Sequence, residues 1–276
     1  MEQEQDSHPQ ETAPPVPLGG DNGANLENAA FTEGQPPSDI GPTGSQGTAE
    51  LEEERVKDEI DIQIDLLTDP DWVVRREAVI TLGEMGDERC VEPLARALRD
   101  GDWQVREVAI EALGQVGSPA VDTLLKLLRD WEVRKYAIAA LGKIRDERVL
   151  NPLMQQLRND EFKDDAVNAL VDLGGPAVQG LIAALKDKEE TVRKCAVLAL
   201  GRIKDPEAIE PLVEMLGDKD WFARLTAAAA LESIGHERGR EAIKPLLKDP
   251  DMVVKMRVER ILAKWKKQSP VQSATA

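Results

Sequence analysis

The sequence has few of the residues on which most catalytic and metal sites depend. It contains two histidines, two cysteines and nine aromatic residues among 276. Cys90 and Cys195 are 105 positions apart, which fits neither a disulfide framework nor a clustered metal site. We therefore interpret both as small core residues. Such sparse thiols favour a reducing, cytoplasmic location.

Basic residues and long apolar runs are also scarce. The chain has 35 Lys and Arg against 52 Asp and Glu, a net charge of −17. A duplex-binding domain needs a basic face, so nucleic acid is not expected as a partner. No stretch approaches the roughly 20 apolar residues of a membrane span. The first residues lack the basic and apolar regions of a secretory signal, so no membrane contact is expected.

The N-terminal part differs in composition from the rest. Residues 1–54 hold 12 Asp and Glu and no Lys or Arg. Residues 1–50 are rich in Pro, Gly, Gln, Asn and Ser, with too few large apolar groups to offset the entropy of ordering. We predict a disordered acidic tail. It either solvates the protein or attracts a basic partner, and the sequence leaves both roles open.

From about residue 55 the chain repeats itself seven times. In each copy a leucine precedes Asp or Asn by two positions, and a basic residue precedes an apolar one by seven. The leucines are Leu67, Leu98, Leu128, Leu157, Leu185, Leu216 and Leu247. The basic residues are Arg75, Arg106, Arg134, Lys163, Arg193, Arg224 and Lys255. Agreement of both markers indicates a unit of about 30 residues.

Each unit reads as two helices joined by a turn. In the second helix, apolar residues at −1, +3, +4 and +7 from the basic residue form one stripe. The residue at +3 is small and permits close helix packing. Glycines after this helix are predicted left-handed stops, namely Gly86, Gly117, Gly174 and Gly235. Prolines inside the first helix are predicted to bend or delay it, namely Pro93, Pro152 and Pro211.

The turn carries a repeated acid such as Asp69 or Asp100. It can cap the second helix. It can also accept a hydrogen bond from the basic residue six positions later, as in Asp69 with Arg75. Stacked units would then form a structural ladder, and a charged binding stripe is the functional alternative.

A two-helix unit cannot bury its own apolar face, so neighbouring units must stack. We predict an all-α, right-handed α-solenoid of six to seven two-helix repeats over residues 51–267. The last unit is expected to form a polar cap that ends at Lys264-Trp265-Lys266-Lys267. Residues 268–276 are predicted to be disordered.

The run Gly86-Asp87-Glu88-Arg89-Cys90-Val91-Glu92-Pro93-Leu94, with Val105-Arg106 to Leu113-Gly114, resembles the HEAT-like repeats of the phycobilisome-lyase type. The resemblance covers about residues 55–267. It implies the fold, whereas such repeats serve as scaffolds, bilin lyases and a hydroxylase alike. The similar deoxyhypusine hydroxylase builds its di-iron centre from several His-Glu pairs. This chain has only His236-Glu237, in the register of Asp87-Glu88, so we predict that it starts a helix and that no metal or cofactor is bound.

Candidate partner-binding residues lie on the second helices. Four tryptophans are predicted to open a second helix, where each either packs on the next unit or contacts a partner. They are Trp72, Trp103, Trp131 and Trp221. Apolar residues are also predicted on the outward side of these helices, the usual concave face of a solenoid, and the best candidates are Tyr136, Leu198 and Leu225.

The sequence thus predicts a cytoplasmic, non-catalytic scaffold or adaptor that binds a protein partner along this face. The alternative is a bilin-lyase-like chaperone that attaches or removes a chromophore or cofactor on a client protein. Enzyme activity of the hydroxylase type is not expected.

Overall fold

The computed structural model describes residues 57–268, which belong to the larger of two compact units, residues 54–276. These described residues form fourteen α-helices and five short 3-10 helices, with no strand among them. The predicted tail, residues 1–50, lies outside the described range. So does the predicted C-terminal segment except Gln268, which is the last residue of α14.

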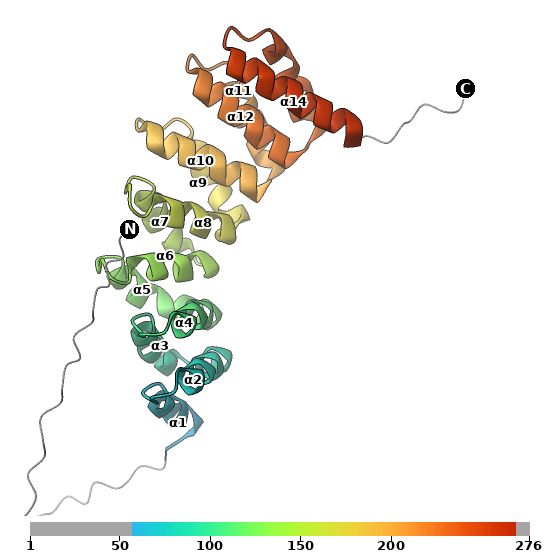
Figure 1. Ribbon diagram of the computed structural model, residues 1–276. Helices are drawn as coiled ribbons and strands as arrows, with labels where there is room; N and C mark the ends of the chain where they lie inside the picture. The colour runs from blue at the N-terminus through green and yellow to red at the C-terminus, as the bar shows by residue number, and fades with distance from the viewer. Residues whose placement is uncertain (1–56, 269–276) are drawn as a thin grey trace, which may run out of the picture. The chain divides into compact units, whose positions relative to one another are not determined.

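The helices pair off in chain order, as the colour sequence in Figure 1 shows. The first helices are α1 (Glu59–Leu66), α3 (Val91–Ala97), α5 (Val121–Leu127), α7 (Glu147–Gln156), α9 (Val178–Ala184), α11 (Ile209–Met215) and α13 (Glu237–Ile243). The second helices are α2 (Trp72–Met85), α4 (Trp103–Val116), α6 (Arg134–Lys143), α8 (Lys163–Leu173), α10 (Glu190–Ile203), α12 (Trp221–Ile234) and α14 (Met252–Gln268). The 3-10 helices are η1 (Glu88–Cys90), η2 (Ser118–Ala120), η3 (Gly175–Ala177), η4 (Pro206–Ala208) and η5 (Lys244–Lys248).

From α2 to α12, each second helix packs against its own first helix and against the next second helix along the chain, whereas α14 packs against η5 and α12. This nearest-neighbour stacking is the α-solenoid that the repeat predicts. The predicted stripe of small residues lies at its centre. All seven are buried, from Ala78 in α2 to Val258 in α14. The core is therefore a continuous row of helix contacts shared between units.

Glycines of the Leu-Gly pairs set the distance between second helices. A Cβ atom added to Gly142 in α6 would lie 2.6 Å from the Cα atom of Ala169 in α8. The same construction at Gly83 in α2 places it 2.7 Å from Ala112 in α4. Both distances are shorter than real contacts, so only glycine permits this packing. The sequence showed the pairs but not this role.

The four predicted stop glycines all have positive φ angles, between 63° and 77°. Gly86 and Gly235 adopt the left-handed αL conformation, whereas Gly117 and Gly174 combine positive φ with an extended ψ. At the end of α10 the αL position is held by Lys204, with φ 61° and ψ 30°. A residue with a side chain is strained in this conformation.

The predicted delay of the first helix occurs in two of the three units with a proline in that helix, but a 3-10 turn also precedes α5 and α9, which have no proline at that position. Pro93 and Pro211 fall in the first turn of α3 and α11, each of which begins one 3-10 turn late. Pro152 lies inside α7, which runs unbroken from Glu147 to Gln156. The seventh unit has a first helix as well: α13, followed by the 3-10 helix η5, precedes the second helix α14.

Candidate functional site

Ion pairs join neighbouring units along the turns that precede the second helices. The Arg75 guanidinium donates from Nε and Nη2 to the Asp100 carboxylate of the next unit, at 2.7 and 2.8 Å. Arg224 and Asp249 repeat this arrangement, with both bonds at 2.8 Å. In both pairs the arginine holds the pKa of the aspartate below its usual value. Further inter-unit pairs are Arg99–Asp130 and Arg158–Asp187.

The sequence predicted that the basic residue bonds the carboxylate of the turn acid in its own unit. That prediction is wrong about the acceptor. Arg75 Nη1 donates to the backbone carbonyl of Asp69 at 2.7 Å, not to its carboxylate. The Asp69 carboxylate instead accepts the backbone N–H of Asp71, and Asp71 is the side-chain cap of α2. Because its own turn uses that carboxylate, the guanidinium reaches the acid of the next turn. The repeated arginines therefore brace their own turn through its backbone carbonyls, and Arg75 and Arg224 in addition hold the next unit through its acid.

The four predicted tryptophans occupy different environments. Trp72, Trp103 and Trp221 begin α2, α4 and α12 as predicted. Trp131 lies in the turn before α6, which begins at Arg134. In this unit the turn is two residues shorter, and the residue before Trp131 is the repeated turn acid itself. This unit therefore has no second acid, between the turn acid and Trp131, that could cap a helix beginning at Trp131.

Two of these indoles are largely exposed. Trp103 is 65% exposed and Trp131 68%, whereas Trp221 is 42% exposed and lies edge-to-face on Phe222. Trp72 is half-buried and packs against the core. Trp131 Nε1 also donates to the Glu161 carboxylate of the next unit at 3.1 Å. The tryptophans thus combine inter-unit packing with exposed surface, and their contact with a partner stays a prediction.

We use the term second-helix face for the positions one, two and five after the basic residue of each second helix. On this face Leu198 of α10 is 53% exposed. Tyr136 of α6 is half-buried, with the Arg106 guanidinium 5.6 Å and the Lys135 ammonium 4.8 Å from its ring centroid. Leu225 of α12 is also half-buried. Of the three predicted residues, only Leu198 can be changed without disturbing core contacts.

An apolar groove of about 540 Å³ lies between α12 and α14, where the second-helix face ends. Leu225, Thr226 and Ala229 line it from α12, and Val253, Met256, Arg257 and Arg260 from α14. Val253 is 51% and Met256 54% exposed. Neither was predicted, although Met256 directly follows Lys255 and so shares the register of Leu225. Met256 could have been predicted from the sequence by taking the position after the basic residue in the seventh unit as well.

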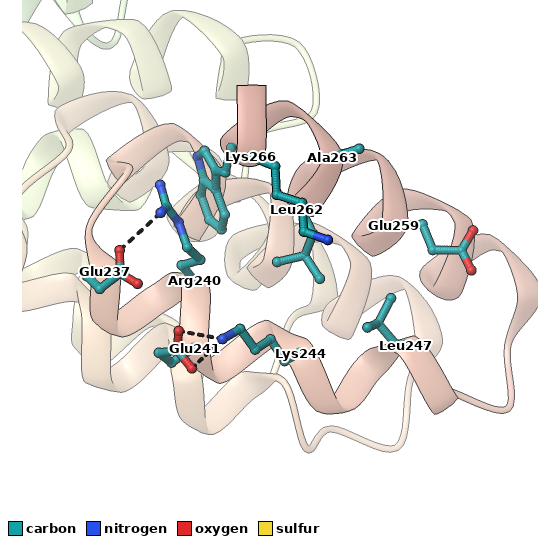
Figure 2. A pocket seen from close by; sticks show the side chains of 10 residues that line it. Glu237, Arg240, Glu241, Lys244, Leu247, Glu259, Leu262, Ala263 and Lys266 are labelled. Atoms are coloured by element: carbon teal, nitrogen blue, oxygen red, sulfur yellow. Dashed lines mark hydrogen bonds and ion pairs between the residues drawn. The ribbon is translucent and has the colours of Figure 1, made fainter. Parts of the chain in front are cut away.

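A second cavity of about 700 Å³ lies between α13, η5 and α14 (Figure 2). Its walls carry three acids and three bases, and Glu237–Arg240 and Glu241–Lys244 form ion pairs there. Trp265 is 4% exposed and lies 5.1 Å from the Arg240 guanidinium. The predicted polar cap is therefore partly wrong, because this indole packs inside the last unit.

His236 caps α13, since its Nδ1 accepts the backbone N–H of Arg238 at 3.1 Å. This is the helix-starting role that its position predicts. Within residues 57–268, no group of three or more His, Cys, Asp or Glu is placed to hold a metal ion. Cys90 and Cys195 are unpaired and buried, and burial raises the pKa of both thiols. A thiol with a raised pKa is a poor nucleophile.

In the part of the chain that the structure describes, no single helix is long and apolar enough to cross a membrane. By length and composition alone, Lys163–Leu173 and Gly175–Ala184 meet the criteria together, as a pair bent by 119°.

Several solved structures are similar in fold. Human deoxyhypusine hydroxylase in complex with glycerol is 22% identical over 75% of this chain and 84% of its own, with a TM-score of 0.39. The complex of CpcE and CpcF of phycocyanin lyase from Nostoc sp. is 22% identical over 81% and 99%, with a TM-score of 0.37. A designed armadillo repeat protein in complex with the peptide (KR)4 is 22% identical over 75% and 99%, with a TM-score of 0.30. Likeness at this level concerns the repeat fold alone.

A search among curated proteins finds no match to the chain. The family of HEAT repeats matches it in four overlapping segments, residues 60–130, 120–171, 158–232 and 177–263. Together these segments extend over most of the sequence and over all seven helix pairs. The chain therefore belongs to the HEAT-repeat family.

Proposed function

We propose that this protein is a non-catalytic scaffold or adaptor that binds another protein along the second-helix face. One observation carries the proposal: this face presents large apolar side chains to solvent at its C-terminal end. On this face Leu198 of α10 and Met256 of α14 are each more than half exposed, and so is Val253, which lines the same groove as Met256. Monomeric proteins seldom leave clustered apolar surface uncovered unless a partner covers it. Repeat proteins offer extended surfaces of this kind.

The ionisable side chains support a non-catalytic role. The repeated arginines are used in structural bonds: Arg75 and Arg224 pair with the acid of the next unit, and Arg106, Arg134 and Arg193 bond backbone carbonyls of their own turn. His236 is used as a helix cap, and both thiols are buried. These groups have structural partners or are out of reach of a substrate.

Three further parts of the proposal rest mainly on sequence. The exposed indoles of Trp103 and Trp131 give the partner a second line of contact, with Trp72 and Trp221 contributing their free edges. A cytoplasmic location is supported by the two unpaired thiols. The finer kinship with repeats of the phycobilisome-lyase type is supported by the Gly86–Leu94 run. We expect no nucleic-acid partner.

The test is quantitative capture from native lysate with the full chain, followed by mass spectrometry. Three baits are compared: the unchanged protein, Leu198→Glu on α10, and Ile62→Glu on the first helix α1. Ile62 is 44% exposed and lies away from the second-helix face. Ile62→Glu is therefore the matched control, because it also replaces an exposed apolar residue with an acid. Circular dichroism confirms that each bait is folded.

We expect a stoichiometric protein partner that Leu198→Glu weakens and Ile62→Glu retains. Equal capture by all three baits would refute binding by the second-helix face. Visible absorbance in the eluate, together with a client protein, would favour the bilin-lyase-like chaperone instead.

A further inference from the structure

We infer that the groove between α12 and α14 binds a short acidic amphipathic helix of a partner protein. This inference rests on the proposed function and adds the chemistry of the ligand. The floor of the groove is apolar, formed by Leu225 and Ala229 on one side and by Val253 and Met256 on the other. Its volume of about 540 Å³ lies in the range of established ligand sites.

The backbone around the groove determines how a peptide can bind there. Both walls are α-helices, whose backbone N–H and C=O groups are bonded within each helix. They offer no edge to which an extended peptide could add as a strand. A polyproline segment needs an aromatic-lined groove, and none of the described residues that line this one is aromatic. The mode that fits the apolar floor is a helix that lays apolar side chains, spaced by one turn, into the groove. Met256 suits this role because a flexible thioether adapts to the shape of its partner.

The charge around the groove selects the sign of the ligand. Arg257 and Lys264 both bond to Glu232, at 2.9 Å each, so this cluster keeps one positive charge. Arg260 is exposed and has no ion-pair partner within residues 57–268. The acid on α14, Glu259, lines the other cavity instead. In a chain of net charge −17, the described residues that line this groove therefore include two arginines and no acid, and only Arg257 of the two is paired with a carboxylate.

These features together identify the ligand. The apolar floor requires apolar anchors, and the basic rim favours Asp or Glu beside them and disfavours Lys or Arg. A purely acidic peptide would leave the floor exposed. A basic amphipathic helix would place like charges together.

The experiment measures peptide binding to the full chain by fluorescence anisotropy. The probe is a fluorescein-labelled 16-residue helical peptide with leucines at one-turn spacing and glutamates elsewhere. Two comparison peptides keep its length: one replaces every glutamate with lysine, and the other scrambles the leucines. Variants are Met256→Glu for the floor and Arg260→Glu for the rim. Arg96→Glu in α3 is the matched control, because Arg96 is also exposed and has no ion pair within the described residues.

We expect the acidic amphipathic peptide to bind the unchanged protein, and more weakly as salt increases. Met256→Glu and Arg260→Glu should each weaken binding about tenfold, and Arg96→Glu less than about twofold. Equal binding of the lysine peptide, or equal weakening by Arg96→Glu, would overturn the inference. So would a dimer that Met256→Glu dissociates in sedimentation, since a second copy would then occupy the groove.

The two proposals fail separately. If Leu198→Glu releases the lysate partner while Arg260→Glu leaves both peptide and partner bound, the scaffold role stands and the groove assignment is wrong. If no variant of the second-helix face releases the partner, the proposed function fails.

Discussion

The buried pair between Arg224 and Asp249 should be the most sensitive contact between units. Asp249 accepts two bonds from the guanidinium at 2.8 Å and a third from the backbone N–H of Asp251. The side chains of the pair are 11% and 2% exposed. The change Asp249→Asn keeps the shape of the side chain but leaves the guanidinium charge without its counter-ion.

The structure offers a control of matched geometry. Arg238 and Glu210 also form two bonds, at 2.7 and 3.0 Å, but these side chains are 51% and 63% exposed. Breaking a buried pair from one side costs about 3–5 kcal/mol. Breaking an exposed pair costs about 0–1 kcal/mol. We therefore expect Asp249→Asn to destabilise the protein by about 3 kcal/mol, and Glu210→Gln by much less, because solvent screens the exposed pair.

Urea unfolding followed by circular dichroism measures both changes. Because units interact mainly with their neighbours, the loss should be local. Hydrogen exchange should accelerate in α12–α14 and remain unchanged in α2–α6. A cost for Asp249→Asn no larger than that for Glu210→Gln, or exchange that accelerates along the whole chain, would refute this account of the pair.

The same pair predicts a pH dependence. Arg224 lowers the pKa of Asp249 in the folded protein, relative to about 3.9 when unfolded. The folded state therefore binds the proton less tightly, and the stabilisation is complete above the unfolded pKa. It is lost as the pH falls through the lower, folded pKa. The stability difference between the unchanged protein and Asp249→Asn should be largest near neutral pH and shrink in acid, whereas a constant difference would contradict the assignment.

Three other changes test the fold. Lys204→Gly should stabilise by about 0.5–1 kcal/mol in urea unfolding, because glycine relieves the αL strain; a loss of stability would refute it. Gly142→Ala should destabilise by about 1–3 kcal/mol through its clash with Ala169, whereas Gly101→Ala, with no atom within 4 Å, should lie within about 0.5 kcal/mol. Equal effects would contradict the close approach. Removing residues 1–50 should leave the calorimetric midpoint unchanged, and a large drop would show that they pack.

Local periodicity was sufficient to predict the fold. Apolar spacing of 3.6 residues places Ala78 and its counterparts on one helix face whatever surrounds them, and seven repeats reinforce the same pattern. Positive φ at Gly86 and Gly235 also follows from residue type and position. The cap formed by His236 was predictable because its register matches Asp87. Each of these features depends on residues only a few positions apart.

The candidate surface was only partly predictable, because exposure depends on neighbouring units. Leu225 and Met256 occupy the same position in their repeats, yet Leu225 packs against the core and Met256 is 54% exposed. The groove beside Met256 exists only where α14 meets α12. Its rim charge depends on which bases Glu232 neutralises. No local pattern contains that information.

Residue spacing alone specifies the repeat, the two helices of each unit and the face that each helix buries. Tertiary structure decided which side chains meet across units. Arg75 does not bond the carboxylate of Asp69, which is six residues away in the chain. It bonds the carboxylate of Asp100, 25 residues away, because stacking brings the next turn within its reach. Local periodicity fixes which side of a helix is apolar. Only the packed neighbour fixes which atoms lie within about 3 Å of it.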